Sequence, residues 1–145
     1  WRDEDNPPPC QCFGNRAAMR VSPVGWYARS KEAVRRLSRI VTAISHDHPE
    51  GLKGAECVAM CVYLARSGGT KRQLLALARE YYPEIGSYTC AQLSQTYRFD
   101  ESCQGTVPQA LTCFFEGTDF EDTIRNAVSV GGDTDTICAI AGSVA

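Results

Sequence analysis

The sequence predicts an all-α protein, a compact bundle of roughly six or seven helices joined by short loops. Two observations support this fold class. Apolar residues recur at helical spacing in several segments, and most of these segments begin at a residue that commonly caps a helix. None of the 145 residues falls in a stretch of sustained apolar–polar alternation, and no internal repeat is present. Functional residues are therefore expected on loops and at helix ends.

The first elements along the chain are an extended lead-in and an amphipathic helix. Pro7-Pro8-Pro9 disfavours a helix in residues 1–12, so order is expected to begin near Phe13. Ser30 is suited to cap a helix that runs to Ser45, with arginines between its apolar positions. The apolar positions of this helix are Val34, Leu37, Val41 and Ile44.

Two further helices follow in the middle of the chain. Pro49 or Glu50 opens a helix of mostly small apolar residues, which ends at Gly68-Gly69. Small residues allow such a helix to pack closely against its neighbours. Thr70 then caps a third helix, which Pro83 terminates.

The C-terminal third contains one weak and three stronger helical segments. The segment 88–97 carries the weaker signal, and residues 102–106 resemble a loop before Pro108 starts a helix to Phe115. Asp119 caps the next helix, with acidic residues in its first turn, and Gly131-Gly132 ends it. A final apolar helix follows Asp133.

Composition and charge exclude several classes of protein. The chain is 43% hydrophobic and 22% charged, with a formal net charge of −2, so disorder and a nucleic-acid-binding surface are both unexpected. The uncharged stretches are too short to span a bilayer, so no membrane partner is expected. Residues 13–145 are predicted to form one helical domain. Because the chain begins at Trp1 without a signal peptide, it is expected to be a fragment or a processed product.

The eight cysteines indicate a reducing compartment rather than a disulfide framework. Several lie within helical apolar patterns, where a cysteine serves as a small buried hydrophobe, and no pair has zinc-binding spacing. Cytoplasmic localisation is therefore predicted. The cysteines are Cys10, Cys12, Cys57, Cys61, Cys90, Cys103, Cys113 and Cys138.

The run Asp133-Thr134-Asp135-Thr136 lies between a glycine pair and the final helix. In an extended loop, residues i and i+2 project to the same side, so the two carboxylates and the Thr136 hydroxyl would converge. Oxygen ligands of this kind suit Mg²⁺, Mn²⁺ or Ca²⁺. An ordinary helix N-cap is the alternative interpretation, although a cap requires only one side chain.

Two other segments could carry chemistry. Gly14-Asn15 lies at the start of a short segment where backbone N–H groups could face a phosphate, although the residues alone favour an ordinary turn. His46 and His48 flank Asp47 and could be ligands or proton carriers; a solvated loop before Pro49 is the alternative.

Four blocks of the sequence together resemble one family, in the same order along the chain. They are FGNRAAMRVSPVG, SHDHPEGLKGAE, YRFDESCQGTVPQAL and FEDTIRNAVSVGGDTDTICAIAGSVA. The chain resembles the C-terminal portion of the ADP-ribosylglycohydrolases, which include dinitrogen-reductase-activating glycohydrolase. The resemblance implies an all-α fold and metal-assisted hydrolysis of the N- or O-glycosidic bond that joins ADP-ribose to an acceptor.

The resemblance also implies roles for individual residues. The family's metal motif falls on Asp133, Asp135 and Thr136, as ligands in a centre of two Mg²⁺ or Mn²⁺ ions. Gly14 and Asn15 match the loop that holds the pyrophosphate and distal ribose, and His46 matches a histidine of the substrate cleft. No catalytic residue is assigned.

The chain departs from the family pattern at two places. Family members usually carry Gly-Asn-Gly, and here Arg16 stands in place of the second glycine. Just before this motif, Cys12-Phe13 replaces a common serine and tyrosine. The motifs that complete the metal centre in the family do not occur in these 145 residues. We therefore expect half of a metal site, an inactive chain in isolation, and a homo-oligomer or partner covering the exposed core. A non-catalytic helical binding module with a relic metal motif is the alternative.

Overall fold

The fold is all-α, as the sequence predicts. The computed structural model describes residues 11–145, and within this range it contains nine helices, no strand and one isolated β-bridge. The helices are α1 (Arg16–Met19), α2 (Ser22–Tyr27), α3 (Lys31–Ala43), α4 (Pro49–Arg66), α5 (Lys71–Tyr81), α6 (Cys90–Thr96), α7 (Cys103–Glu116), α8 (Phe120–Val130) and α9 (Thr134–Val144). The predicted number of six to seven was too low.

The additional helices are α1 and α2, which are too short to show a helical period in the sequence. Helices of one or two turns gain little from propensity, so tertiary packing must stabilise them. Ala17 and Ala18 of α1 are buried, and Gly25 lets α2 lie directly against α4. A Cβ atom at Gly25 would lie 2.6 Å from the Val62 Cβ and 2.7 Å from the Ala59 carbonyl oxygen.

Helix α7 starts earlier than the sequence suggests. It begins at Cys103, and Pro108 lies inside it rather than at its start. The Ser102 hydroxyl caps the helix by accepting the Gly105 N–H at 3.0 Å. Burial of Cys103, Thr106 and Val107 stabilises the turn before the proline. The expected loop over 102–106 is therefore the capped first turn of α7.

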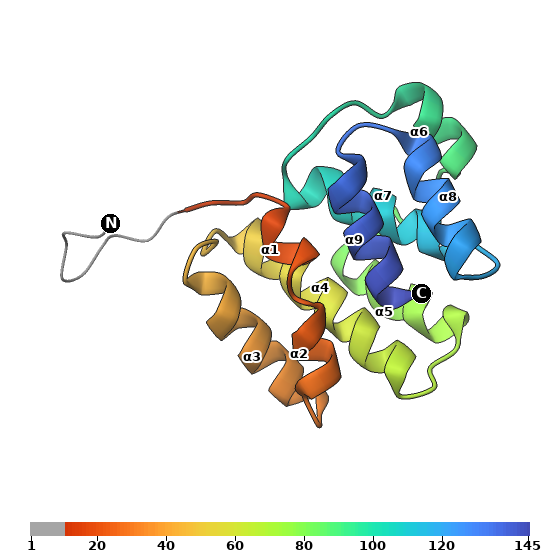
Figure 1. The fold of residues 1–145 in the computed structure, drawn as a ribbon. Coiled ribbons are helices and arrows are strands. Elements are labelled where there is room, and N and C mark those ends of the chain that lie inside the picture. The colour runs from red at the N-terminus through yellow and green to blue at the C-terminus, as the bar shows by residue number, and fades with distance from the viewer. Residues whose placement is uncertain (1–10) are drawn as a thin grey trace.

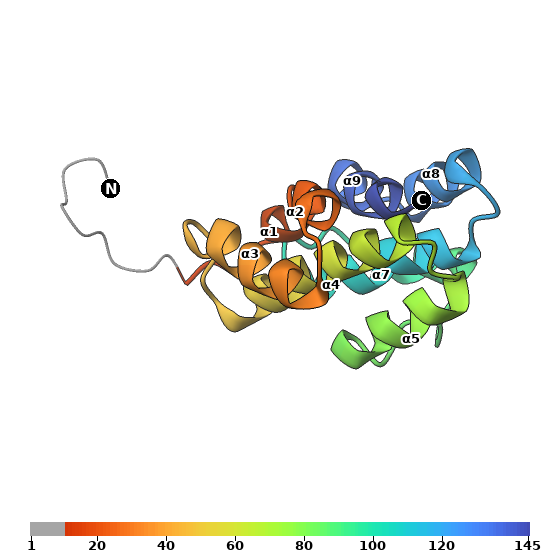
Figure 2. The same ribbon diagram turned by 90° about the horizontal axis from the view of Figure 1, so that it is seen from below.

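Helices α4 and α7 occupy the middle of the molecule. Figure 1 shows α1, α2 and α3 along one side of α4, with α7, α8 and α9 packed together on the other side. Seen from below, α4 and α7 lie between a layer that contains α1, α2, α8 and α9 and the separate helix α5 (Figure 2). The buried apolar side chains of all these elements form one cluster, which includes Met60 and Leu111. The single-domain assignment of residues 13–145 stays a prediction.

Helix α3 buries a different face from the one its apolar residues suggest. Val34, Ser38 and Thr42 are buried, whereas Val41 and Ile44 are exposed. Ser38 satisfies its hydroxyl within the helix by donating to the Arg35 carbonyl oxygen at 3.1 Å. Small hydroxyl side chains allow α3 to approach α4 closely, so its bulkier apolar residues remain outside.

The cysteines match their predicted role where the structure describes them. Five are buried, Cys12 and Cys138 are half-buried, and none of these seven forms a disulfide. Cys10 lies outside the described residues. In the described part of the chain, none of the helices has the length and apolar character that crossing a membrane requires. Localisation in the cytoplasm stays a prediction.

Candidate active site

Two distant sequence blocks pair at the start of the site. The Asn15 N–H donates to the Glu101 carbonyl oxygen at 2.7 Å, and the Cys103 N–H donates to the Phe13 carbonyl oxygen at 2.9 Å. The Cys103 thiol also contacts the Gly14 carbonyl oxygen at 3.3 Å. This pairing places the Gly14-Asn15 segment against the start of α7.

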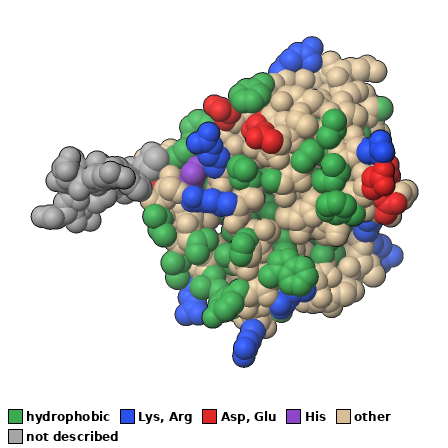
Figure 3. Space-filling model, in the orientation of Figure 1, with side chains coloured by type: hydrophobic (Ala, Val, Ile, Leu, Met, Phe, Trp, Pro, Cys, Tyr) green, Lys and Arg blue, Asp and Glu red, His purple; other side chains and the backbone are tan. Residues whose placement is uncertain are grey.

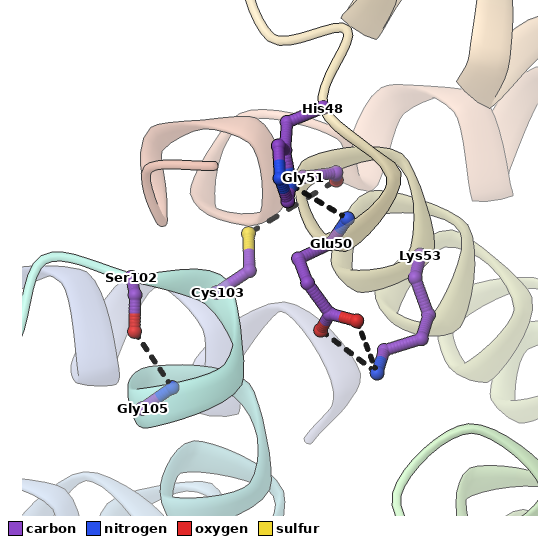
Figure 4. A network of polar contacts seen from close by, with 7 residues as sticks. All are labelled: His48, Glu50, Gly51, Lys53, Ser102, Cys103 and Gly105. Atoms are coloured by element: carbon purple, nitrogen blue, oxygen red, sulfur yellow. Dashed lines mark hydrogen bonds and ion pairs between the residues drawn. The ribbon is translucent and has the colours of Figure 1, made fainter. Parts of the chain in front are cut away.

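The site also includes the first turn of α4, which lies beside Cys103. Figure 4 shows Gly51 of α4 facing the Cys103 thiol, whose sulfur lies 4.0 Å from the Gly51 carbonyl oxygen. His48 caps α4, because its Nδ1 accepts the Glu50 N–H at 3.2 Å. His48 does not line the pocket that contains His46. The two histidines of the His-Asp-His run therefore occupy different environments.

Asn15 is the central polar residue of the site. Its side chain is buried, and its amide nitrogen lies 2.5 Å from Asp133 Oδ2, 3.0 Å from Thr106 Oγ1 and 3.3 Å from the Asp100 carbonyl oxygen. The amide has two N–H donors for these three acceptors, so at least one donor is shared. Asn15 thus links the start of α1 to the starts of α7 and α9.

The acidic run lies at the N-terminus of α9. The helix begins at Thr134, so the assumption of an extended loop was wrong, and Asp135 and Thr136 lie in its first turn. Asp133 occupies the N-cap position but makes no side-chain cap hydrogen bond, so the capping interpretation fails for this residue. The neighbouring acid Asp135 does bind a backbone group: its carboxylate accepts a hydrogen bond from the Thr136 N–H at 2.9 Å.

The carboxylates of Asp133 and Asp135 interact directly. Burial raises the pKa of Asp133, and hydrogen bonding with Asp135 adds to the rise, although the Asn15 amide opposes it. The pKa of the exposed Asp135 is lowered, mainly by the same hydrogen bond with Asp133. Two neighbouring carboxylates repel when both are ionised, and a cation bound between them would relieve the repulsion.

The structure also shows what the acidic run lacks. Within residues 11–145, no group of three or more His, Cys, Asp or Glu side chains is placed to hold a metal ion. The run therefore supplies two carboxylates and the buried Thr136 hydroxyl, fewer than the roughly six oxygen ligands that Mg²⁺ requires.

A pocket of about 370 Å³, which we call the His46 pocket, adjoins Asn15. It lies between the start of α1, the segment after α3 and the loop before α7. Its lining residues are Cys12, Gly14, Asn15, Arg16, Ser45, His46 and Glu101. All three residues with a predicted substrate-binding role, Gly14, Asn15 and His46, lie around this one space. Its volume falls in the lower part of the range of small-molecule sites, about 300–1,000 Å³.

Basic side chains surround the histidine of this pocket. Figure 3 shows a histidine between two groups of Lys and Arg side chains, with acidic side chains close by. His46 Nδ1 lies 2.9 Å from the Ser45 hydroxyl, which also accepts a hydrogen bond from the Arg20 guanidinium. Burial lowers the pKa of His46, and the charges of Arg20 and Arg16 lower it further. His46 is therefore neutral at pH 7.

This pKa shift predicts how stability depends on pH. Because the pKa of His46 is below its ordinary 6.5, the unfolded chain takes up a proton at higher pH than the folded chain. The free energy of unfolding should therefore decrease as pH falls from 7.5 through 6.5 and below. Urea unfolding between pH 7.5 and 5.5 measures this slope, which His46→Gln should reduce. Arg20→Met should also reduce it, since loss of that charge raises the pKa of His46; an unchanged slope in both variants would contradict the assignment.

Sequence reasoning missed the residues that join these parts. Asp100, Glu101 and Thr106 hold Asn15, and Arg20 holds Ser45. They lie inside the sequence blocks that carry the family resemblance, but no role could be assigned to them because their partners are distant in the sequence. Arg16, noted only as a departure from a glycine, is exposed at the pocket, and its charge contributes to lowering the pKa of Asp135.

Comparison with known proteins gives consistent matches over the chain. The profile of the ADP-ribosylglycohydrolase family matches residues 1–145. An uncharacterized protein of Archaeoglobus fulgidus is 30% identical over 143 residues, which cover 88% of this chain and 47% of that protein. ADP-ribosylhydrolase ARH3 of Homo sapiens is 26% identical over an alignment 178 positions long, which covers 92% of this chain and 49% of that protein.

A solved structure described as an ADP-ribosylglycohydrolase-related protein complex is also similar. It superposes with a TM-score of 0.73 at 29% sequence identity, over 94% of this chain and 50% of that chain. The chain thus spans about half the length of the relatives that it matches.

Proposed function

Because the chain belongs to the ADP-ribosylglycohydrolase family, we propose that it serves the hydrolysis of ADP-ribosylated substrates. The bond broken would be the N- or O-glycosidic bond between the anomeric carbon of ADP-ribose and its acceptor. We propose that residues 13–145 supply the ADP-ribose pocket and one side of a divalent-metal site, and that the isolated chain is inactive.

The observation that carries this proposal is the hydrogen bond between Asn15 and Asp133. Its donor belongs to the wall of the His46 pocket, and its acceptor belongs to the acidic run. A ligand in the pocket would therefore lie next to the carboxylates. Substrate binding and bond cleavage require such proximity, because the reacting groups must be held together.

The oxygen atoms of the acidic run could supply part of the coordination shell of a hard divalent cation. Asp133, Asp135 and Thr136 offer only oxygen atoms, and Asp135 is exposed and forms no ion pair within the described chain. These residues would hold Mg²⁺ or Mn²⁺ together with water and groups from elsewhere. When bound, the metal would fix the ribose hydroxyls and activate a water near the anomeric carbon.

The other residues of the pocket would bind and orient the substrate. Arg16 and Arg20 carry positive charge close to His46, which favours the pyrophosphate of ADP-ribose. A neutral His46 offers a hydrogen-bonding ring nitrogen without adding to the positive charge. Asn15 would hold Asp133 in place rather than contact the pyrophosphate, since its amide nitrogen is already committed.

Calorimetry with Mg²⁺ and ADP-ribose tests this proposal most directly. We expect ADP-ribose to bind more tightly in the presence of Mg²⁺ and His46→Gln to weaken that binding. A hydrolysis assay on ADP-ribosyl-arginine in the same samples tests the expected inactivity of the isolated chain. Failure to bind either Mg²⁺ or ADP-ribose would count against the proposed function.

A second candidate function is a non-catalytic helical binding module. The absence of a complete metal-ligand cluster within residues 11–145 favours it. This candidate predicts that ADP-ribose binding, if present, is unaffected by Mg²⁺ or by its removal with a chelator. The same calorimetric series therefore separates the two functions.

Asp135→Asn separates metal binding from helix stability. Asp135 is exposed, and the one backbone group that it binds is the neighbouring Thr136 N–H, so its replacement should change the metal-free unfolding free energy by less than about 0.5 kcal/mol. The increase in melting temperature that Mg²⁺ gives the parent chain should disappear. The control is Glu121→Gln, an exposed acid on α8 that should retain the Mg²⁺ effect. An equal Mg²⁺ effect in Asp135→Asn would contradict a ligand role.

We also propose that the chain associates through the α3 stripe, which comprises Ile40, Val41 and Ile44. These side chains are 56%, 41% and 67% exposed on one face of the helix. Light scattering should show a dimer or larger species, and Ile40→Lys with Ile44→Lys should give a monomer. Val128→Lys is the control, because Val128 is equally exposed on the distant helix α8. A monomeric parent chain would contradict the proposal.

A further inference from the structure

A second concave surface lies where the end of α2, the start of α3 and the end of α4 meet. We call it the α2–α3 groove. Its volume is about 670 Å³, within the range of about 300–1,000 Å³ that is usual for ligand sites. Its chemically distinctive lining residues are Trp26, Tyr27, Arg29, Arg36 and Arg66. None of them belongs to the His46 pocket.

The aromatic side chains of the groove are exposed but their backbone is held firmly. Trp26 is 61% exposed and Tyr27 is 79% exposed. Arg66 donates to the carbonyl oxygens of Trp26 and Ala28, the latter at 3.1 Å, and its guanidinium lies 5.9 Å from the centre of the Trp26 ring. Arg66 therefore fixes the end of α2 and leaves the aromatic rings open to a ligand.

The charge of the groove is uncompensated. Arg29 and Arg36 are exposed and form no ion pair with any described residue, whereas the neighbouring Arg35 lies 3.4 Å from Glu56. Among residues 11–145, no acidic side chain lines the groove. Figure 3 shows hydrophobic and basic side chains over the α2 and α3 region, while the visible acidic side chains lie elsewhere on that face.

We propose that the α2–α3 groove binds a nucleoside diphosphate. A base would stack on Trp26, since every nucleobase presents a flat π face to an aromatic side chain. Arg29 and Arg36 would bind the phosphates, because a guanidinium forms paired hydrogen bonds with phosphate oxygens. A simple anion would use the guanidinium groups but not the aromatic face.

The groove is spatially separate from the His46 pocket. Its α3 residues lie in the first two turns of the helix, and His46 follows the helix at the opposite end. The helix is roughly 20 Å long at a rise of about 1.5 Å per residue, and the two pockets share no lining residue. This inference therefore does not rest on the proposed function.

Tryptophan fluorescence tests the proposal, because the chain has only two tryptophans, Trp1 and Trp26. In a Trp1→Phe background, Trp26 is the sole tryptophan reporter, and ADP should change its emission in a saturable way. Arg29→Ala with Arg36→Ala should weaken ADP binding at least about tenfold, since each lost charged hydrogen bond typically weakens binding several-fold or more. Arg39→Ala, an exposed α3 arginine outside the groove, is the matched control.

Further ligands and one further variant make the test specific. Adenosine and pyrophosphate should each bind more weakly than ADP if the ring and the phosphates both contribute. Glu121→Gln, an exposed substitution on α8 outside both pockets, should leave the ADP titration unchanged. Circular dichroism and urea unfolding should show that the arginine variants retain the parent fold.

Two titration results would overturn the proposal: an absence of saturable change with ADP, and equal titrations of the parent and the double arginine variant. Iodide quenching of the ADP-free chain gives a third, because shielding of Trp26 from iodide would show that a contact between copies covers the groove. Association through the α3 stripe, which is already expected, would by itself leave Trp26 accessible.

Discussion

Asn15→Ala is expected to lower the free energy of unfolding by about 2–4 kcal/mol, because it removes several buried hydrogen bonds, one of them to a carboxylate. The Asn15 side chain is only 3% exposed. The hydrogen bonds from its amide nitrogen to Asp133, Asp100 and Thr106 would all be lost. The buried Asp133 carboxylate would also lose its donor. Urea unfolding at pH 7 without added metal measures the change.

The same variant tests whether Asn15 positions Asp133. A double-mutant cycle with Asp133→Ala should give a coupling energy above about 1 kcal/mol, as residues in one buried network usually do. Asn126→Ala is the matched control on α8, where the half-buried side chain should change stability by less than about 0.5 kcal/mol. Additive effects of the Asn15 and Asp133 substitutions would show that their hydrogen bond contributes nothing.

Gly25→Ala is expected to destabilise the fold by about 2–3 kcal/mol, because overpacking at a close helix contact forces the backbone to move. The added methyl group would lie 2.7 Å from the Ala59 carbonyl oxygen and 2.6 Å from the Val62 Cβ. Neither atom is the end of a flexible side chain. Helix α2 would have to shift away from α4, which thermal or urea unfolding would detect.

Gly68→Ala separates crowding from backbone strain. Gly68 has a φ of 82°, where an alanine is strained, but no atom lies within 4 Å of an added Cβ. Its substitution should therefore be less harmful, at about 1 kcal/mol, the usual penalty for a single residue in the left-handed region. A larger loss for Gly68→Ala than for Gly25→Ala would contradict the close α2–α4 packing.

Most helices could be predicted because their signals are local. Ser30, Thr70 and Asp119 each cap a helix by accepting an N–H from the residue three positions later, as their sequence context predicts. Gly131 ends α8 with a φ of 77°, which favours glycine. The α7 boundary was missed because Pro108 gives a strong start signal, whereas burial of the preceding turn is not visible in the sequence.

The candidate site was predictable in its residue types but not in its connections. The acidic run suggested oxygen ligands, and the Gly14-Asn15 and His46 segments suggested a pocket, in each case with a simpler alternative. The structure places Gly14, Asn15 and His46 around one space and Asn15 against Asp133. The roles of these residues in substrate and metal binding stay proposals.

The all-α class, the caps of several helices and the family can be read from the sequence, since caps and sequence blocks depend on residues close together in the chain. The burial of Ser38 and Thr42 on α3 in place of its larger exposed apolar residues, and the contact between Asn15 and Asp133, are visible in the folded structure alone. Asn15 and Asp133 are 118 positions apart in the sequence, so no interaction between sequence neighbours can bring them together. Their contact results from how α1, α7 and α9 pack together around α4, which depends on the shape of the whole core.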